Sequence, residues 1–329
     1  MEDEYTLVTG VTGFIGSHVV EKLLSENYRV LAVVRNSKNR KEIDDFRTKG
    51  AVLVDGQFYD DTVLNTIFTN YRVSNVIHIA AVRGAGKGVI DDYHMVNVHG
   101  TEVLLKHSLN NGVGRFIYCS SVGVYGTIPA ELPALVTTAF NGDNDYHRSK
   151  ILAEIKVMEY IDLGLNAYIV RPTIAYGRGD NGFPSTLAAL VRRRMLLLPM
   201  SENRIHLIDV EKLADVFMKI MTTENKRDRI FIAADASAIS CRELADIIHA
   251  DFYGTPYPSY LTLPDFVFDL LAGLFSFMRN DKWLVRILLI SRSWYFDSAD
   301  SAAKLALVPS ETKEGFKRFL TQLKHQSHE

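Results

Sequence analysis

The octapeptide Thr9-Gly10-Val11-Thr12-Gly13-Phe14-Ile15-Gly16 decides the fold that the sequence predicts. The apolar run 5–9 that leads into it has the character of a strand, and residues 17–25 after it show helical periodicity. Strand, glycine turn and helix in this order are typical of a dinucleotide-binding turn. Its glycines allow a tight turn, close approach of the backbone to a pyrophosphate, and close packing of the helix on the strand. The three glycines are assigned these roles in order; a glycine-rich turn without a ligand is the alternative.

Apolar, strand-like runs alternate with helical stretches along the first half of the chain. After the first strand, the predicted strands are 28–34, 51–54, 73–79, 115–119 and 166–170, and the predicted long helices are 93–111 and 146–163. Strands that alternate with helices at this spacing form a parallel sheet with helices on both faces. The predicted class is therefore α/β, and because ligands of such sheets bind beyond the carboxyl ends of the strands, the residues that follow each strand are site candidates.

Residues at the ends of the second and fourth strands also fit a dinucleotide. Arg35 and Lys38 follow the second strand, where an acid would bind the ribose of NAD and a cation would accommodate the 2′-phosphate of NADP. Ordinary solvated charge is the alternative for both side chains. Ala80 and Ala81 are small enough to let the cofactor lie against the fourth strand. The sequence therefore predicts NADP, with NAD as the alternative, and the predicted contacts in the glycine turn are Gly10, Thr12, Gly13, Phe14, Ile15 and Gly16.

A tyrosine and a lysine stand four residues apart at the start of the helix 146–163. At this spacing Tyr146 and Lys150 share one helix face, so the ammonium would stabilise the phenolate and lower the tyrosine pKa from its usual ~10. An exposed tyrosine and lysine on a surface helix are the alternative, because the spacing is common. Ser121 follows the fifth strand and falls at the edge where ligands bind. His78 has no evident partner and is predicted to be a packed core residue.

Six motifs stand along the chain in a fixed order. They are Thr9-Gly10-x-x-Gly13-Phe14-Ile15-Gly16, Ala80-Ala81, Asn97-x-x-Gly100-Thr101, Ser120-Ser121 before Val124-Tyr125-Gly126, Tyr146-x-x-x-Lys150, and Arg171-Pro172 before Tyr176-Gly177. Their order and spacing resemble the extended short-chain dehydrogenase/reductase family, which includes NAD-dependent epimerases and dehydratases.

The resemblance implies a Rossmann domain, that is, a doubly wound parallel sheet, with bound NAD or NADP. It implies a catalytic set that carries over to Ser121, Tyr146 and Lys150. Further cofactor contacts carry over to Asn97 and Pro172. Gln57 is a departure, because these proteins often place an acid there, near the adenine; the adenine contact at this position is an expectation only.

Beyond residue 177 the regular alternation of strands and helices loosens. We therefore expect an NAD(P)-binding Rossmann domain over 1–177 and a smaller, mostly helical and mainly substrate-binding domain over 178–329, with 204–233 returning to the first domain. Asp209 and Ser240 each precede a helical stretch and are predicted to be N-caps.

Composition narrows the partners and the compartment. The 37 Lys and Arg against 39 Asp and Glu give a formal net charge of −2, so the bulk charge does not favour nucleic acid, and a small-molecule substrate is the predicted partner. Cys119 and Cys241 cannot make a disulfide framework, and the acidic N-terminus is unlike a signal peptide. The predicted location is cytoplasmic, and no metal site is predicted.

The segment 263–290 is the least generic part of the second half. Its first helix is apolar around most of its circumference, with polar residues on one narrow stripe. We favour a lid or subdomain helix that packs on the substrate side or on a partner subunit, and a peripheral membrane contact is the alternative. The run is short of the ~20 residues that a spanning helix needs. The family resemblance also implies a homodimer, with the helices 93–111 and 146–163 as candidates for its interface.

Three functions remain open at this point. The first is an oxidoreductase that moves a hydride between NADP(H) and a hydroxyl or ketone carbon of a fairly apolar small molecule, which resembles 3β-hydroxysteroid dehydrogenases and dihydroflavonol reductases. The second is a nucleotide-sugar 4-epimerase with tightly bound NAD; Ile174 replaces the asparagine that many of these enzymes use for the diphosphate, although Arg192–Arg194, Arg204 or Arg292 could bind it instead. The third is a non-catalytic NADP-binding regulator, which such relatives become by losing the tyrosine or lysine that this chain keeps.

Overall fold

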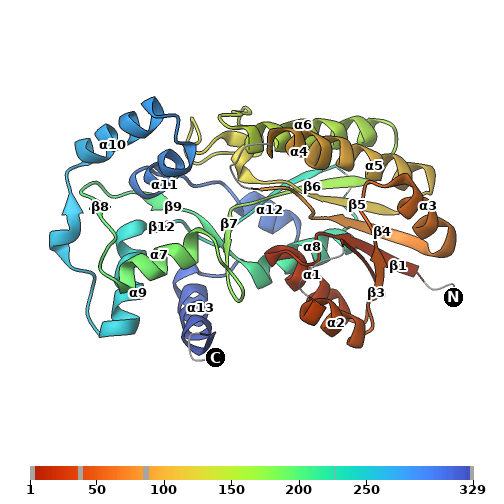
Figure 1. Cartoon of the computed structure of the whole chain (residues 1–329), viewed down its shortest axis with the longest axis horizontal. Helices are drawn as coiled ribbons and strands as arrows, with labels where there is room; N and C mark the ends of the chain where they lie inside the picture. The colour runs from red at the N-terminus through yellow and green to blue at the C-terminus, as the bar shows by residue number, and fades with distance from the viewer. Residues whose placement is uncertain (1–3, 36–39, 84–88, 226, 327–329) are drawn as a thin grey trace.

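Parallel strands form the central sheet of this protein, whose computed structural model describes residues 4–35, 40–83, 89–225 and 227–326. Within these residues the sheet has seven strands in the order β11-β6-β5-β4-β1-β2-β3 (Figure 1). Their bounds are β1 Glu4–Thr9, β2 Val30–Val34, β3 Val52–Asp55, β4 Arg72–His78, β5 Arg115–Cys119, β6 Ala167–Pro172 and β11 Ile230–Ala233. The predicted strands of the first half all pair in this sheet, so the doubly wound α/β fold is confirmed.

Helices cover both faces of the sheet because neighbouring strand residues point to opposite sides. Val8 packs in the cluster that holds α1 (Phe14–Ser25), α2 (Arg40–Thr48) and α8 (Val210–Thr222), while Leu7 packs in the cluster of the opposite face. That second face is covered by α3 (Asp61–Asn70), α5 (Gly100–Asn110) and α6 (Asp145–Asp162), seen above the sheet in Figure 1.

The chain reverses direction within the sheet at β1. From β1 it builds outward through β2 and β3, then crosses to the other side of β1 and continues through β4, β5, β6 and β11. Loops that leave β1 and β4 therefore diverge, and they leave a crevice at the carboxyl ends of these two strands. Ligands of doubly wound sheets bind at this switch point.

The predicted helix 93–111 is divided in the structure. Short helix α4 (Val89–Asp92) leads into a π-helical segment, η1 (Tyr93–His99), and the regular helix α5 begins only at Gly100. A π-helical turn widens the backbone ladder and is frequent near functional sites. Here it lies next to α6, which carries the predicted catalytic tyrosine.

The second half of the chain builds a separate apolar cluster beside the sheet. It is formed by α7 (Phe183–Arg192), α9 (Cys241–Tyr253) and α13 (Thr312–Gln326), with Trp294 fully buried among them. Two-stranded pairings support it: β7 (Ile174–Tyr176) with β10 (Leu207–Asp209), β9 (Arg204–Ile205) with β12 (Ile239–Ser240), and β8 (Leu198–Pro199) with β13 (Thr262–Leu263). The remaining short elements are η2 (Val122–Tyr125), η3 (Ser259–Leu261) and α12 (Ala299–Lys304).

Both predicted N-caps are confirmed. Asp209 precedes α8 and its carboxylate accepts from the N–H of Glu211, while Ser240 precedes α9 and accepts from the N–H of Glu243. The carboxylate of Asp209 also binds Arg318 of α13. Asp209 therefore has a structural role, as an N-cap and as the partner of Arg318.

Helix α10 (Asp265–Phe277) lies at the end of the molecule farthest from β3 and packs on α11 (Asp281–Ser291) (Figure 1). Phe268 is its one buried residue. The opposite face is apolar and uncovered in the described part of the chain, with Phe266, Leu270 and Phe277 exposed by 67%, 71% and 88%. Among the described residues no helix is long and apolar enough to cross a membrane. Contact of 263–290 with a partner subunit or a membrane surface remains a prediction.

Candidate active site

The glycine turn after β1 is shaped by contacts that a side chain would block. Gly10 has φ of +76° and a Cβ there would lie 2.6 Å from the backbone nitrogen of Ala80. A Cβ on Gly16 would overlap the carbonyl oxygen of Gly10. Helix α1 then begins at Phe14, and its N-cap Gly13 offers no capping side chain. The first N–H groups of α1 are therefore available to an anion, as at a pyrophosphate site.

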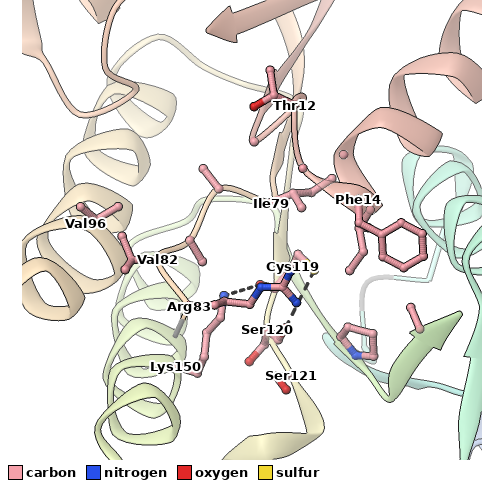
Figure 2. A pocket seen from close by; sticks show the side chains of 18 of the residues that line it. Thr12, Phe14, Ile79, Val82, Arg83, Val96, Cys119, Ser120, Ser121 and Lys150 are labelled. Carbon is pink, nitrogen blue, oxygen red and sulfur yellow. Dashed lines mark hydrogen bonds between the residues drawn. The ribbon is translucent and has the colours of Figure 1, made fainter. Parts of the chain in front are cut away.

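A cavity of about 550 Å³ opens at the carboxyl ends of β1 and β4, as the switch point predicts (Figure 2). Its volume suits a small-molecule site. The predicted site residues that line it are Gly10, Thr12, Gly13, Phe14, Ile15, Gly16, Arg35, Gln57, Ala80, Ala81, Ser121, Tyr146, Lys150 and Pro172. The structure thus brings together residues that are up to 162 positions apart in sequence (Gly10 and Pro172, 172 − 10).

Two predicted cofactor residues are not part of this lining. Lys38 lies outside the described residues. Asn97 is buried behind the cavity, where its side chain accepts from the N–H of Val82 at 2.8 Å and donates to the carbonyl of Val82 at 3.1 Å and to Ser149 at 3.0 Å. Asn97 links the segment after β4 to α6, and a contact between Asn97 and the cofactor remains a prediction.

Lys150 is buried at the foot of the cavity, with 2% of its surface exposed. Its Nζ donates to the carbonyl of Cys119 at 2.8 Å and to the hydroxyl of Tyr118 at 3.3 Å. Burial lowers the pKa of Lys150 to about 8, because the charged form loses hydration. Among the described residues it has no carboxylate in ion-pair contact. A lysine in this position is costly to the fold, which points to a role in the site.

Tyr146 lies on the same helix face as Lys150, as the spacing predicts. Its side chain is partly exposed to the cavity, yet its hydroxyl lies deep enough that burial raises the pKa to about 12, and the guanidinium of Arg83 acts in the opposite direction. The predicted lowering of the tyrosine pKa by Lys150 is therefore wrong for this structure. The loss of hydration on burial outweighs the nearby cations, and the Lys150 ammonium is directed to the Cys119 carbonyl.

Three residues with hydroxyl side chains, Ser120, Ser121 and Thr173, line the cavity near the ends of β5 and β6. Ser121 accepts from the N–H of Gly123 at 3.0 Å, which orients its Oγ. The hydroxyls of Ser120 and Thr173 are buried without a hydrogen-bond partner among the described residues, although both residues line the cavity. An unpaired buried hydroxyl costs about 1–3 kcal/mol, so these two groups fit a bound molecule that supplies the partner.

Buried polar contacts hold the elements that carry the site. His78 is fully buried between the hydroxyls of Thr9 and Thr101, at 2.7 and 2.9 Å, and burial lowers its pKa to about 3. It is a core residue, as predicted. Arg171 of β6 and Glu154 of α6 form an ion pair at 2.6 Å with side chains 2% and 1% exposed. This pair fixes α6, with its tyrosine and lysine, to the sheet.

The lining includes polar residues that were not found from the sequence, among them Arg83 and His147. Arg83 stands two positions after Ala81 and projects into the cavity near Lys150 and Ser120 (Figure 2). His147 directly follows Tyr146 and also lines the cavity. Both are neighbours of motif residues, but the motifs do not include them, and only the packing of α6 on η2 shows where His147 points.

Comparison with known proteins places these observations in a family. The model of the NAD dependent epimerase/dehydratase family matches residues 6–234. A UDP-glucose 4-epimerase of Erwinia amylovora is 34% identical over 161 residues, 47% of this chain and 48% of the relative. One of Vibrio cholerae is 29% identical over 269 residues, 77% of this chain and 78% of the relative. The chain thus spans only about half the length of the first of these relatives.

Solved structures agree on the fold over the whole chain. The UDP-glucose 4-epimerase of Thermotoga maritima with UDP-glucose has a TM-score of 0.77 at 21% identity and covers 98% of this chain and 99% of its own. The enzyme WbmH of Bordetella bronchiseptica in complex with NAD+ has a TM-score of 0.75 at 18% identity, with 99% of both chains covered. With the glycine turn, the doubly wound sheet and the match over 6–234, this chain belongs to the NAD-dependent epimerase/dehydratase family.

Proposed function

We propose that this protein binds a nicotinamide dinucleotide along the crevice at β1 and β4 and transfers a hydride to or from a carbon that bears an oxygen. The observation that carries the proposal is the burial of Lys150 beside Tyr146 at the foot of the cavity, since a buried ammonium with no carboxylate in ion-pair contact among the described residues is costly to the fold. The glycine turn, the uncapped start of α1 and the unpaired hydroxyls of Ser120 and Thr173 fit the cofactor.

When bound, the nicotinamide would supply or accept the hydride. Tyr146 would give a proton to the substrate oxygen, or take one from it, at its phenolic Oη. A pKa of about 12 keeps the proton on Tyr146 at neutral pH, which suits donation, and the Arg83 guanidinium favours the phenolate needed for the reverse direction. Ser121, whose Oγ is oriented by the N–H of Gly123, would hold the same substrate oxygen.

For the substrate we propose a nucleotide sugar, interconverted at one carbon by a 4-epimerase reaction that returns the hydride to the same molecule. The support is the relatives, which are named UDP-glucose 4-epimerases. The arginines that were predicted to bind the diphosphate do not add to this support, because none of them is among the described residues that line the cavity. Arg192 and Arg194 stack on aromatic rings. Arg204 and Arg292 pair with carboxylates.

A second candidate is a reductase for a fairly apolar ketone. It is favoured by three apolar residues of the lining, Ile174, Phe183 and Pro184, and by Ile174 in the place where many epimerases have an asparagine for the diphosphate. Asp180 and Asn181 line the same part of the cavity, so this part is not wholly apolar. The two candidates differ in one measurable respect: an epimerase leaves the cofactor unchanged over a full cycle, and a reductase consumes it.

The cofactor form is also a proposal. Arg35 is exposed at the end of β2 and lines the cavity, which supports a contact with the 2′-phosphate of NADP. The structural neighbour from Bordetella bronchiseptica was solved with NAD+, which supports NAD instead. We retain NADP as the prediction from Arg35, because its position by the crevice is a property of this chain.

The oligomer and the domain division are proposed on separate grounds. Leu152, Ile155 and Met158 are exposed on α6, and Met95 on η1, which gives the two predicted helices an apolar outer face and supports a homodimer through them. The division into 1–177 and 178–329 is supported by the separate apolar cluster that α7, α9 and α13 form beside the sheet, and the return of 204–233 by the place of β11 in the sheet. Cytoplasmic location remains a prediction.

One experiment separates these functions. The purified protein is first denatured and the released nucleotide identified, and then the protein is incubated with UDP-glucose and, separately, with apolar ketones plus NADPH or NADH. Formation of UDP-galactose without a net change in nicotinamide absorbance supports the epimerase, whereas oxidation of NADPH by ketones supports the reductase. In either case Tyr146→Phe should lower the rate by roughly 10²–10⁴. Full activity of this variant would refute the assignment of the proton to Tyr146.

A further inference from the structure

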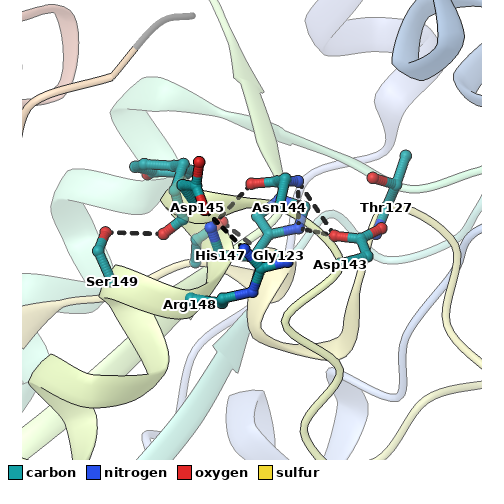
Figure 3. Close-up of polar contacts among 10 residues, drawn as sticks. Gly123, Thr127, Asp143, Asn144, Asp145, His147, Arg148 and Ser149 are labelled. Atoms are coloured by element: carbon teal, nitrogen blue, oxygen red, sulfur yellow. Dashed lines mark hydrogen bonds and ion pairs between the residues drawn. The ribbon is translucent and has the colours of Figure 1, made fainter. Parts of the chain in front are cut away.

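His147 is held against the residues that follow Ser121. It follows Tyr146 on α6, its ring lies 5.9 Å from the tyrosine ring between centroids, and 14% of its side chain is exposed. The imidazole edge lies over Gly123 in η2, where a Cβ would overlap the Cδ2 and Nε2 atoms (Figure 3). The absence of a side chain at position 123 is therefore what admits this ring to the wall of the cavity.

A carboxylate fixes the orientation of the ring. The Nδ1 of His147 lies 2.5 Å from Oδ1 of Asp143, whose other oxygen accepts from the N–H of Thr127 at 2.7 Å. Burial alone would raise the pKa of Asp143, but the hydrogen bonds from His147 and Thr127 lower it overall, so this group is a carboxylate. Because a carboxylate only accepts, Nδ1 must carry the hydrogen.

Asn144 completes the arrangement. Its side-chain oxygen accepts from the N–H of His147 at 2.9 Å and its amide nitrogen donates to Asp143 at 3.0 Å. The amide nitrogen also lies 2.8 Å from Nδ1 of the ring, but as a donor it cannot take the ring hydrogen. Asp143 is therefore the acceptor for Nδ1–H, and in the neutral ring Nε2 is the nitrogen with a free lone pair.

No hydrogen bond to Nε2 is formed within the described part of the chain; this atom lies next to Gly123, and His147 is one of the residues that line the cavity. The other titratable groups around the ring are Tyr146 and the exposed ion pair of Asp145 with Arg148 on α6. On η2 the titratable residue is Tyr125, whose hydroxyl accepts from Arg171. Nε2 of the neutral ring can only accept a hydrogen bond, and it lies on the neighbour of the proposed proton donor Tyr146. Such a nitrogen favours a ligand that offers a hydrogen-bond donor at this position.

We propose that Nε2 of His147 accepts a hydrogen bond from a second hydroxyl of the substrate. This rests on the proposed function, because Tyr146 is taken to meet the reacting oxygen. With the two rings as side-chain neighbours, the second hydroxyl lies on a carbon close to the reacting one. Asp143 and Asn144 act through His147 and are positioning residues.

A tautomer measurement tests the geometry without any activity. In ¹⁵N-histidine NMR at neutral pH, the signals of His147, assigned by their loss in His147→Gln, should be those of a neutral ring with hydrogen on Nδ1. Asp143→Asn should move the hydrogen to Nε2, because an amide can donate to Nδ1. Asp145→Asn, which alters a neighbouring carboxylate, should leave the signals unchanged. A ring with hydrogen on Nε2, or on both nitrogens, in the unsubstituted protein would overturn the proposal.

Selectivity tests the binding role. The substrate is the one that the protein accepts in the assay above. Its kcat/KM is compared with the kcat/KM of deoxy analogues, each of which lacks one hydroxyl group near the reacting carbon. His147→Phe should lower kcat/KM for the full substrate by about tenfold, the usual worth of a neutral hydrogen bond, and leave that for one deoxy analogue nearly unchanged. His147→Gln, which keeps an acceptor, should restore most of the loss.

The outcomes distinguish this inference from the proposed function. Equal losses for the full substrate and for every deoxy analogue would show a structural role for His147 and refute the inference. The proposed function would still stand after that result, provided that Tyr146→Phe is nearly inactive under the same conditions. Full activity of Tyr146→Phe would instead refute the proposed function, and the NMR result would then decide the orientation of His147 separately.

Discussion

Replacing Lys150 with methionine should abolish turnover and change how stability depends on pH. The lysine has a pKa of about 8 in the folded protein against 10.5 ordinarily, because its ammonium is buried. At about 1.4 kcal/mol for each tenfold change in proton affinity, keeping the ammonium costs the folded state about 3 kcal/mol at neutral pH. Methionine removes this cost but leaves the carbonyl of Cys119 without its donor, which costs about 1–3 kcal/mol.

The direction of the pH effect follows from which state holds the proton. Below pH 8 both states carry the ammonium and the cost is fully present. Between pH 8 and 10.5 the folded protein releases the proton while the unfolded chain keeps it, so the free energy of unfolding of the unsubstituted protein rises by about 3 kcal/mol from this group. The Lys150→Met variant lacks this rise. Its stability relative to the unsubstituted protein should therefore fall by about 3 kcal/mol between pH 7 and pH 10.5.

Urea unfolding followed by tryptophan fluorescence at pH 7 and pH 10.5 measures this difference, and groups that titrate in both proteins cancel. Lys156→Met is the matched control on the same helix. Hydrogen bonds from Lys156 to Glu159 and Glu102 raise its pKa above 10.5, so its contribution persists below that pH and the control should show little change across the window. If the Lys150→Met variant and the unsubstituted protein changed in parallel, the buried-ammonium argument would be wrong.

Other expectations concern the cofactor and the oligomer. Arg35→Ala should weaken NADPH binding by about 10- to 100-fold in fluorescence titrations, the usual worth of a charge-assisted contact, and change NADH binding little; equal effects would argue against a 2′-phosphate contact. Gly16→Ala should displace the turn and lower dinucleotide affinity at least tenfold, whereas Gly273→Ala, where a Cβ meets no atom within 4 Å, should keep binding and raise stability by about 0.5–1 kcal/mol. Ile155→Glu should convert a dimer to a monomer in light scattering; an unchanged mass would exclude α6 from the interface.

Most of the fold was predictable because it depends on local patterns. The glycine turn, the alternation of strands and helices, and capping residues such as Asp209 each act over a few positions, and each is found where the sequence predicts it. The predicted strand 115–119 and helix 146–163 match β5 and α6 within one residue. The site positions followed as well, because residues after parallel strands collect at one edge.

What the sequence did not predict depends on contacts between distant segments. Asn97 belongs to a motif, yet its hydrogen bonds to Val82 and Ser149 were not evident from the sequence. The pKa of Tyr146 depends on burial, which four-residue spacing does not report. His147 gains its position only because Gly123, on another element, leaves room for the ring.

The ion pair between Glu154 and Arg171 also constrains how this sequence can evolve. Losing either member alone would strand a charge in the interior at a cost of about 3–5 kcal/mol, while a well-packed apolar pair at both positions can be close to neutral. Drift by single substitutions is therefore blocked at both positions, and a change at one should be accompanied by a change at the other. A library randomised at the two codons together should yield apolar pairs that one-codon libraries never reach.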